Sequence, residues 1–177
     1  MKKILALLAF AATSACAQTS VVLQHDRDVG HETKLSVARK TSFGTFDAGV
    51  FAVRGPLSAN GYDLGYRNGV EYGPLMLSAR AGFGRLNNID INGGGFVGNT
   101  NYLSATADAR LKVYDEFGVY VNARHRNSIG DGPNQNRLQA GVDMQVSEGV
   151  GARVGVSHAR QAGQKGTGLT AAINYTF

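Results

Sequence analysis

Several features that would narrow the fold or the chemistry are scarce in this 177-residue chain. It has one cysteine, three prolines and no tryptophan, and charged residues make up only 18% of it. With so few charges and 43% hydrophobic residues, it is not expected to be disordered. Long apolar runs are also missing, because the longest covers residues 4–12 and a membrane-spanning helix needs about 20 such residues. The sequence therefore excludes a helical membrane protein.

The first 17 residues have the pattern of an export signal. A positive end, an apolar core and a small-residue cleavage site follow one another, at Lys2-Lys3, residues 4–12 and Ala15-Cys16-Ala17. We therefore expect a signal peptide over residues 1–17 and one mature domain over residues 18–177. Removal of the signal would take away the sole cysteine, and with it any disulfide, thiol nucleophile or cysteine-bound metal. A lipoprotein acylated at Cys16 is the alternative, although Thr13 stands where such signals usually have leucine.

Apolar side chains recur at every second position through the mature chain, which is the period of a β-strand with two unlike faces. Breaks in this pattern separate ten expected strands: 20–28, 33–43, 46–54, 62–72, 75–85, 102–113, 117–128, 136–147, 150–160 and 167–177. The first three alternate least cleanly, because Arg39 and Phe51 fall on the wrong faces. Eight strands is therefore the alternative, if the region before Gly55 crosses fewer times.

The connections between these segments alternate in length. Short ones lie around Gly44, Gly73-Pro74, Asp115-Glu116 and Glu148-Gly149, and longer polar ones at 29–32, 55–61, 86–101, 129–135 and 161–166. This alternation places all the short turns at one end of the structure. The segments are also long, close to the roughly 9–11 residues that a tilted transmembrane strand needs.

The aromatic residues indicate which face of the strands is outside. Those expected at the short-turn end are Phe43, Phe46, Tyr72, Tyr114, Phe117, Tyr175 and Phe177, and those nearer the long-loop end are Tyr62, Tyr66, Phe83 and Tyr102. Two aromatic girdles around an aliphatic band are typical of a barrel whose apolar face contacts lipid. A soluble β-sandwich is the alternative, but it has no reason to sort its aromatic residues by depth.

The polar faces of the expected strands carry charges in mid-strand, with acids and bases interspersed. The expected lumen-lining network comprises Asp63, Arg67, Glu71, Arg80, Asp108, Arg110, Arg124, Asp143 and Arg153. A narrow barrel filled by such residues is expected to be closed or only narrowly conductive. If it conducts, its arginines should favour anions.

The last segment carries a more specific signal, because Leu169, Ala171, Ile173, Tyr175 and Phe177 alternate to the final residue. In this the sequence resembles bacterial outer-membrane β-barrels, and among them the small OmpX, YfaZ and OmpA-barrel type. The resemblance implies an all-β, closed, antiparallel, up-and-down transmembrane barrel in the cell outer membrane of a Gram-negative bacterium. It also implies that the barrel-assembly machinery recognises Ile173, Tyr175 and Phe177.

The histidines suggest a candidate surface site. By strand parity, His25, His125 and His158 face lipid near the long-loop end, with Arg160 beside the last of them. Cationic groups there could bind the phosphates of lipopolysaccharide. An interfacial polar rim without a specific ligand is the alternative.

Two further motifs are incomplete. Residues 124–128 loosely resemble the active segment of outer-membrane lipid A deacylases, which uses a lipid-facing His and Ser two residues apart. Here Asn127 follows His125 on one face and Ser128 points to the other, so no enzyme is expected. The longest loop begins like a calcium-binding loop, with Asn88, Asp90, Asn92 and Gly93, but Asn99 stands where such a loop needs Glu. We therefore expect no metal and no cofactor.

These observations favour a small porin-like outer-membrane barrel with a structural role, or with loops that contact a surface ligand of unknown identity. A narrow porin-like channel for ions or very small solutes is the alternative, and a lipid A-modifying acyl hydrolase is the second. The expected partners are outer-membrane lipid, including lipopolysaccharide, and the barrel-assembly machinery. Nucleic acid is not an expected partner, because basic residues are dispersed among acidic ones.

Overall fold

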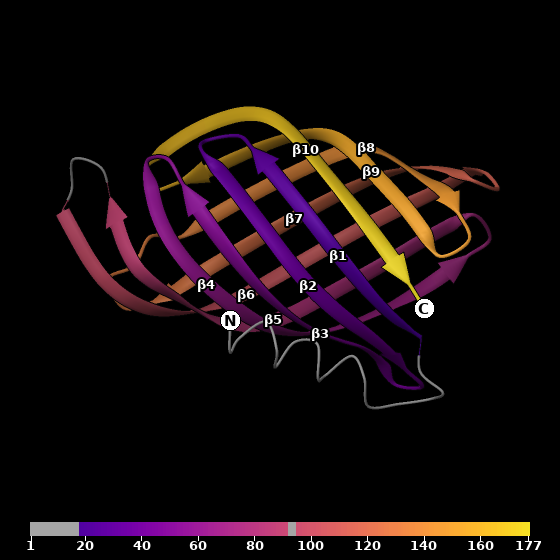
Figure 1. Cartoon of the computed structure of the whole chain (residues 1–177), viewed down its shortest axis with the longest axis horizontal. Helices are drawn as coiled ribbons and strands as arrows, with labels where there is room; N and C mark the ends of the chain where they lie inside the picture. Colours follow the sequence, from indigo (N-terminus) through magenta and orange to yellow (C-terminus); the bar gives the residue numbers. More distant parts are fainter. Residues whose placement is uncertain (1–17, 92–94) are drawn as a thin grey trace.

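A computed structural model describes residues 18–91 and 95–177, which form a closed barrel of ten antiparallel strands (Figure 1). The strands are β1 Thr19–Arg27, β2 His31–Thr41, β3 Gly44–Arg54, β4 Leu57–Tyr72, β5 Leu75–Ile91, β6 Gly95–Tyr114, β7 Phe117–Ile129, β8 Gln135–Ser147, β9 Val150–Gln161 and β10 Gln164–Thr176. The predicted fold class is confirmed, with ten strands rather than eight. The predicted signal peptide and the lipoprotein alternative at Cys16 lie outside the described residues.

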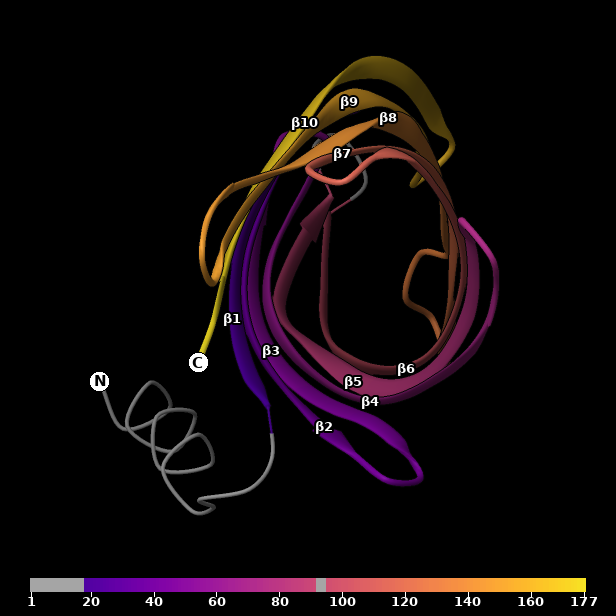
Figure 2. The ribbon, with the colours of Figure 1, turned by 90° about the vertical axis from the view of Figure 1, so that its right-hand side faces the viewer.

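The barrel closes between its first and last strands. Arg27 pairs with Leu169, and the pairing continues to the end of β10. The backbone N–H groups of Thr19 and Phe177 each donate to the other residue's carbonyl oxygen, at 3.1 and 2.9 Å. The C-terminus therefore lies beside β1, and the strands wind around a common interior (Figure 2). Closure satisfies every sheet edge, which matters where lipid cannot hydrogen-bond to free N–H and C=O groups.

The described part of the chain contains no helix that is both long and apolar enough to cross a membrane.

The two ends of the barrel differ less in loop length than predicted. The turns at one end, which we call the short-turn end, are short as predicted, at residues 42–43, 73–74, 115–116 and 148–149. Connections at the opposite end, the loop end, are also brief, at residues 28–30, 55–56, 130–134 and 162–163. The predicted loop over residues 86–101 is wrong for most of its length, because β5 continues to Ile91 and β6 starts at Gly95. Cross-strand pairing overrides the low β propensity of these Gly- and Asn-rich segments.

Side chains alternate between a lipid-facing exterior and a polar interior. Large apolar residues are exposed on the exterior, among them Leu23, Leu64, Leu103, Leu169 and Ile173. Buried polar and charged residues fill much of the interior, among them Asp26, Glu32, Asp63, Arg126 and Arg137. This distribution is the reverse of a soluble protein and is typical of transmembrane barrels. The β-sandwich alternative is therefore wrong.

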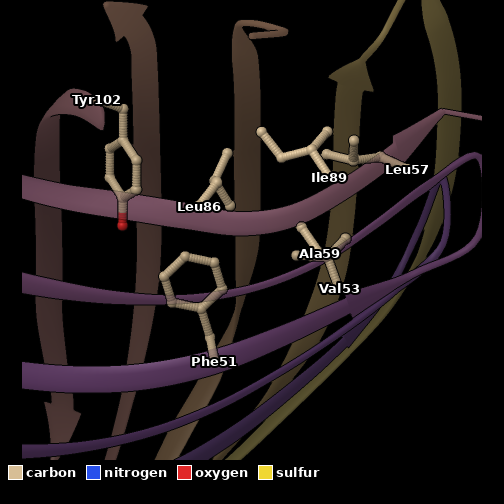
Figure 3. Packing of buried hydrophobic residues seen from close by; sticks show 7 residues of the cluster. All are labelled: Phe51, Val53, Leu57, Ala59, Leu86, Ile89 and Tyr102. Atoms are coloured by element: carbon tan, nitrogen blue, oxygen red, sulfur yellow. The ribbon is translucent and has the colours of Figure 1, made fainter. Parts of the chain in front are cut away.

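One part of the interior is apolar. Seven residues of β3–β6 pack together there, and we call them the apolar plug (Figure 3): Phe51, Val53, Leu57, Ala59, Leu86, Ile89 and Tyr102. The inward position of Phe51 explains the irregular alternation in its strand. Its ring meets that of Tyr102 edge-on, with centroids 6.3 Å apart. The plug lies toward the loop end, because Phe51 is near the end of β3 and Leu57 begins β4.

The aromatic residues divide into exterior and interior groups. Of the predicted girdle, Phe117 is half-buried and the others are exposed: Phe43, Phe46, Tyr72, Tyr114, Tyr175 and Phe177. Two assignments to the long-loop end are wrong. Tyr66 lies beside Phe46 and its hydroxyl donates to the Phe43 carbonyl oxygen, so it belongs to the short-turn end. Tyr102 is fully buried inside the barrel, because its register puts it on the inward face of β6.

Candidate functional site

The interior near the loop end is organised around one buried carboxylate. Glu32, whose side chain is 1% exposed, contacts three guanidinium groups. Arg124 lies 2.9 Å away, Arg126 3.1 Å and Arg137 3.2 Å. We call these four residues the Glu32 centre. Glu32 is on β2 and Arg124 on β7, strands that lie five positions apart in either direction around the barrel. The centre therefore bridges opposite walls.

Arg137 extends the Glu32 centre toward β1. Its guanidinium lies 2.5 Å from Asp26 and 2.8 Å from Asp28. Neutral donors complete the environment of both carboxylates: Gln139 and Thr170 donate to Asp26, and Ser157 donates to Asp28. Each buried charge in this group thus has both a partner of opposite sign and hydrogen bonds, which a buried ion pair requires for stability.

A second ionic group lies on β2–β5. The Arg80 guanidinium donates to both carboxylate oxygens of Asp47, at 2.5–3.0 Å, and lies 3.5 Å from Asp63. Lys34 donates to Asp63 at 3.0 Å. Gly65 makes room for this arrangement, because a Cβ there would lie 2.3 Å from the guanidinium carbon of Arg80.

Nearer the short-turn end, the interior ion pairs are more exposed. Arg110 pairs with Asp143, and Arg153 lies 3.8 Å from Asp108. The two arginine side chains are 37% and 35% exposed. The Arg153 guanidinium also stacks on Tyr120, 4.1 Å from the ring centroid. These arginines are therefore more exposed than those of the Glu32 centre, which are 2–14% exposed.

The structure places seven of the nine predicted lumen residues in ion pairs: Asp63, Arg80, Asp108, Arg110, Arg124, Asp143 and Arg153. The other two, Arg67 and Glu71, are exposed and form no ion pair with a described residue. They share the inward face of β4 but lie close to the short-turn end. Alternation along a strand predicts which side chains face the interior. It does not predict how far along the barrel axis each one lies, and therefore not which partner it contacts.

Sequence reasoning missed the other half of the network: Asp26, Asp28, Glu32, Lys34, Asp47, Arg126 and Arg137. The available signal, parity, was weak here, because Asp26, Glu32 and Arg126 have polar neighbours on both sides and only Asp47 has apolar ones on both sides. With them, the interior ion pairs comprise seven acids and seven bases. The acids are Asp26, Asp28, Glu32, Asp47, Asp63, Asp108 and Asp143, and the bases are Lys34, Arg80, Arg110, Arg124, Arg126, Arg137 and Arg153. The paired charges therefore balance.

The Glu32 centre and the apolar plug meet through Arg126. Its guanidinium lies over the rings of Phe51 and Tyr102, 4.4 and 5.2 Å from their centroids. A void of about 10 Å³ lies where the plug and Arg126 face the connection before β8. That volume is close to the smallest that holds one water molecule, about 10–15 Å³. Side chains therefore fill the space between the plug, Arg126 and this connection.

The histidines lie on the exterior, as parity predicts. His25, His125 and His158 are exposed, and their ring nitrogens hydrogen-bond to Thr33, Asn136 and Thr167, at 2.8, 2.6 and 2.8 Å. Each partner is on the next strand.

The deacylase-like arrangement is not assembled around His125. The hydroxyl of Ser128 is on the opposite face of β7 and donates to the Pro133 carbonyl oxygen. Asn127, which shares the exterior face with His125, supplies no nucleophile.

In the described part of the calcium-like pattern, the first residue takes part in a local hydrogen bond. The backbone N–H of Asn88 donates to the side-chain oxygen of Asn99, at 3.0 Å. Asn92 and Gly93 lie outside the described residues. Among residues 18–91 and 95–177, no group of three or more His, Cys, Asp or Glu side chains is placed to hold a metal ion.

Comparison with known proteins supports the fold rather than a specific activity. No protein-family model matches the chain, and no curated protein matches its sequence. Among solved structures, the KdgM porin is 10% identical with a TM-score of 0.53, over 89% of this chain and 99% of that one. The NanC porin is 8% identical with a TM-score of 0.50, over 92% and 99%. These neighbours are bacterial outer-membrane β-barrels, consistent with the predicted location in the cell outer membrane.

Proposed function

We propose that this protein is a closed outer-membrane barrel with a structural or interaction role, carried by its outer surface rather than by transport through its interior. The Glu32 centre is the observation that carries this proposal. It bridges opposite walls of the barrel, and its four side chains are buried or nearly so. The brief loop-end connections leave the strand exterior as the largest surface for a partner.

The energetics of the interior also support closure. A hydrated ion would have to separate Glu32 from its arginines or displace the apolar plug. Breaking a buried pair by removing one partner costs about 3–5 kcal/mol, so thermal opening of this centre should be rare. The balanced ion pairs also leave no excess positive charge of the kind an anion-selective constriction uses.

A narrow channel is the second candidate. The fold likeness to the KdgM and NanC porins favours it, and so do the exposed Arg110 and Arg153 near the short-turn end. The first proposal includes kinship with the OmpX, YfaZ and OmpA-barrel type. The strand pattern and the final Phe177 support that kinship. The lipid A hydrolase reading is the weakest, because no serine joins His125 on its face.

Chloride efflux from proteoliposomes distinguishes a closed barrel from a channel. The wild type should release chloride no faster than protein-free liposomes. A Tyr102→Ala/Arg126→Ala variant, which removes the contact between the plug and the Glu32 centre, should release it faster. Leu103→Ala is the matched control, because it removes bulk from the neighbouring lipid-facing position. Efflux through the wild type and Leu103→Ala as fast as through the double variant would contradict closure.

A further inference from the structure

The outer wall of the barrel carries an apolar groove of about 800 Å³. It crosses six neighbouring strands, β4–β9, along two rows of paired residues. One row is Tyr66, Ala81, Ala105, His125, Asn136 and Arg160, and the other is Asn68, Ala79, Ala107, Ala123, Leu138 and His158. All of them are exposed on the lipid-facing side of the barrel.

The groove exists because small side chains lie between rows of large ones. Alanines form its floor on β5–β7. The adjacent rows on the two sides carry exposed apolar side chains: Leu64, Phe83 and Leu103 on one, and Val70, Leu77 and Val121 on the other. The result is a trough with apolar walls, of a volume typical of ligand sites, about 300–1,000 Å³.

One end of the groove is basic. His158 and Arg160 lie there, and Arg160 pairs across to Lys165 on β10. All three are exposed, and neither Arg160 nor Lys165 forms an ion pair with a described residue. The exterior faces of β7–β10 carry no acidic residue, whereas the acids of these and the other strands lie mainly inside. The exposed charges on the strands at this end are therefore positive.

The groove is oriented to receive a lipid from one leaflet. Its basic end lies at the loop end of the barrel, since Arg160 is next to the last residue of β9. Six strands spaced about 4.8 Å apart span roughly 24 Å. With strands tilted about 40°, a row across them descends roughly 15 Å, half of a hydrocarbon core about 30 Å thick.

We propose that this groove binds a phosphorylated lipid of the outer leaflet, which surrounds the loop end when the short turns and the paired chain ends, Thr19 and Phe177, face the periplasm. Its phosphate would lie among His158, Arg160 and Lys165, where charge-assisted hydrogen bonds to phosphate are strong. One acyl chain would lie along the alanine floor toward Tyr66, sheltered by the apolar walls. The proposal rests on the proposed interaction role of the outer wall, and it does not depend on closure of the interior, which the efflux experiment tests separately.

Native mass spectrometry of the folded full-length mature barrel in neutral detergent tests the proposal. The probe is lipid A, which has both phosphate and acyl chains. Diacylglycerol has only the acyl chains, and inorganic phosphate has only the anion. The wild type should retain lipid A, and it should retain diacylglycerol and inorganic phosphate at least tenfold more weakly.

Variants separate the two parts of the site. Ala105→Phe, which fills the groove, and Arg160→Ser/Lys165→Ser, which removes its charge, should each weaken lipid A binding about tenfold or more. Ala171→Phe is the matched control, because it enlarges an exposed alanine on β10 outside the groove. The gel mobility shift on boiling verifies folding, and Ala107→Leu replaces Ala105→Phe if the latter does not fold.

Three results would overturn the proposal. Equal retention of lipid A by the wild type and the groove variant would mean that the groove is not the site. Equal retention of diacylglycerol would mean that the basic end recognises nothing. A lipid-free dimer that Ala105→Phe dissociates would assign the groove to a second copy of the chain.

Discussion

Glu32→Gln tests the energetic importance of the Glu32 centre. The substitution keeps the shape of the side chain and an oxygen acceptor, and it removes the negative charge. Among the described residues, Glu32 is the only carboxylate within 4.0 Å of Arg124 and Arg126. Arg137 keeps two other partners, Asp26 and Asp28. The variant therefore leaves two buried guanidinium groups without an anion.

The cost follows from burial. The Glu32 side chain is 1% exposed, and those of Arg124 and Arg126 are 14% and 5% exposed. Loss of one partner from a buried pair costs about 3–5 kcal/mol, and water can relieve Arg124 more readily than Arg126. Two arginines lose their anion, but rearrangement relieves part of the repulsion between them. We therefore expect the free energy of unfolding to fall by about 3–5 kcal/mol, the cost of one broken pair.

Urea unfolding in detergent micelles, followed by the gel mobility shift, measures this loss. Asp115→Asn is the matched control, because it makes the same change at an exposed pair with Lys112 in a short turn. The control should unfold like the wild type, since exposed pairs contribute little. A Glu32→Gln loss below about 1 kcal/mol, comparable with the control, would refute the argument that this centre holds the walls together.

Three further predictions concern other contacts. Gly65→Ala should lower stability by about 1–3 kcal/mol in the same urea titration, because the new methyl group displaces Arg80; unchanged stability would show that the guanidinium moves freely. Tyr66→Phe should cost about 1 kcal/mol through loss of the hydrogen bond to the Phe43 carbonyl, and a neutral result would mean water replaces it. Phe177→Ala should slow assembly in cells, measured as the heat-modifiable fraction, and leave refolding in detergent unchanged; equal slowing in both would argue against recognition by the assembly machinery.

The positions of the strands could be predicted from sequence because lipid outside and polar groups inside impose a strict period of two. Turns such as Gly73-Pro74 then divided the pattern correctly. Strand lengths were harder to predict. Past Leu86, β5 continues with two asparagines in succession and its pairing with β6 shifts register, so the alternation breaks while cross-strand pairing continues to Ile91.

The depth of each side chain could not be predicted, because it depends on the stagger between strands. Arg67 and Arg80 are paired neighbours on the inward face, yet only Arg80 has ionic partners in the interior. Likewise, the contact between Glu32 and Arg124 joins residues 92 positions apart across the barrel. Alternation assigns Arg124 to the inside, Glu32 fell within the predicted connection at 29–32, and only closure of the barrel brings the two together. The exterior groove is also a product of register, because its alanines come from three strands.

Planar-bilayer conductance of the refolded mature protein tests closure most directly. Only protein whose gel mobility changes on boiling should be used, so that an absence of current can be attributed to a folded barrel rather than to unfolded protein. We predict no discrete current steps, because the Glu32 centre and the apolar plug occupy the interior. Discrete, salt-dependent steps with anion preference would contradict this account and would establish a narrow channel.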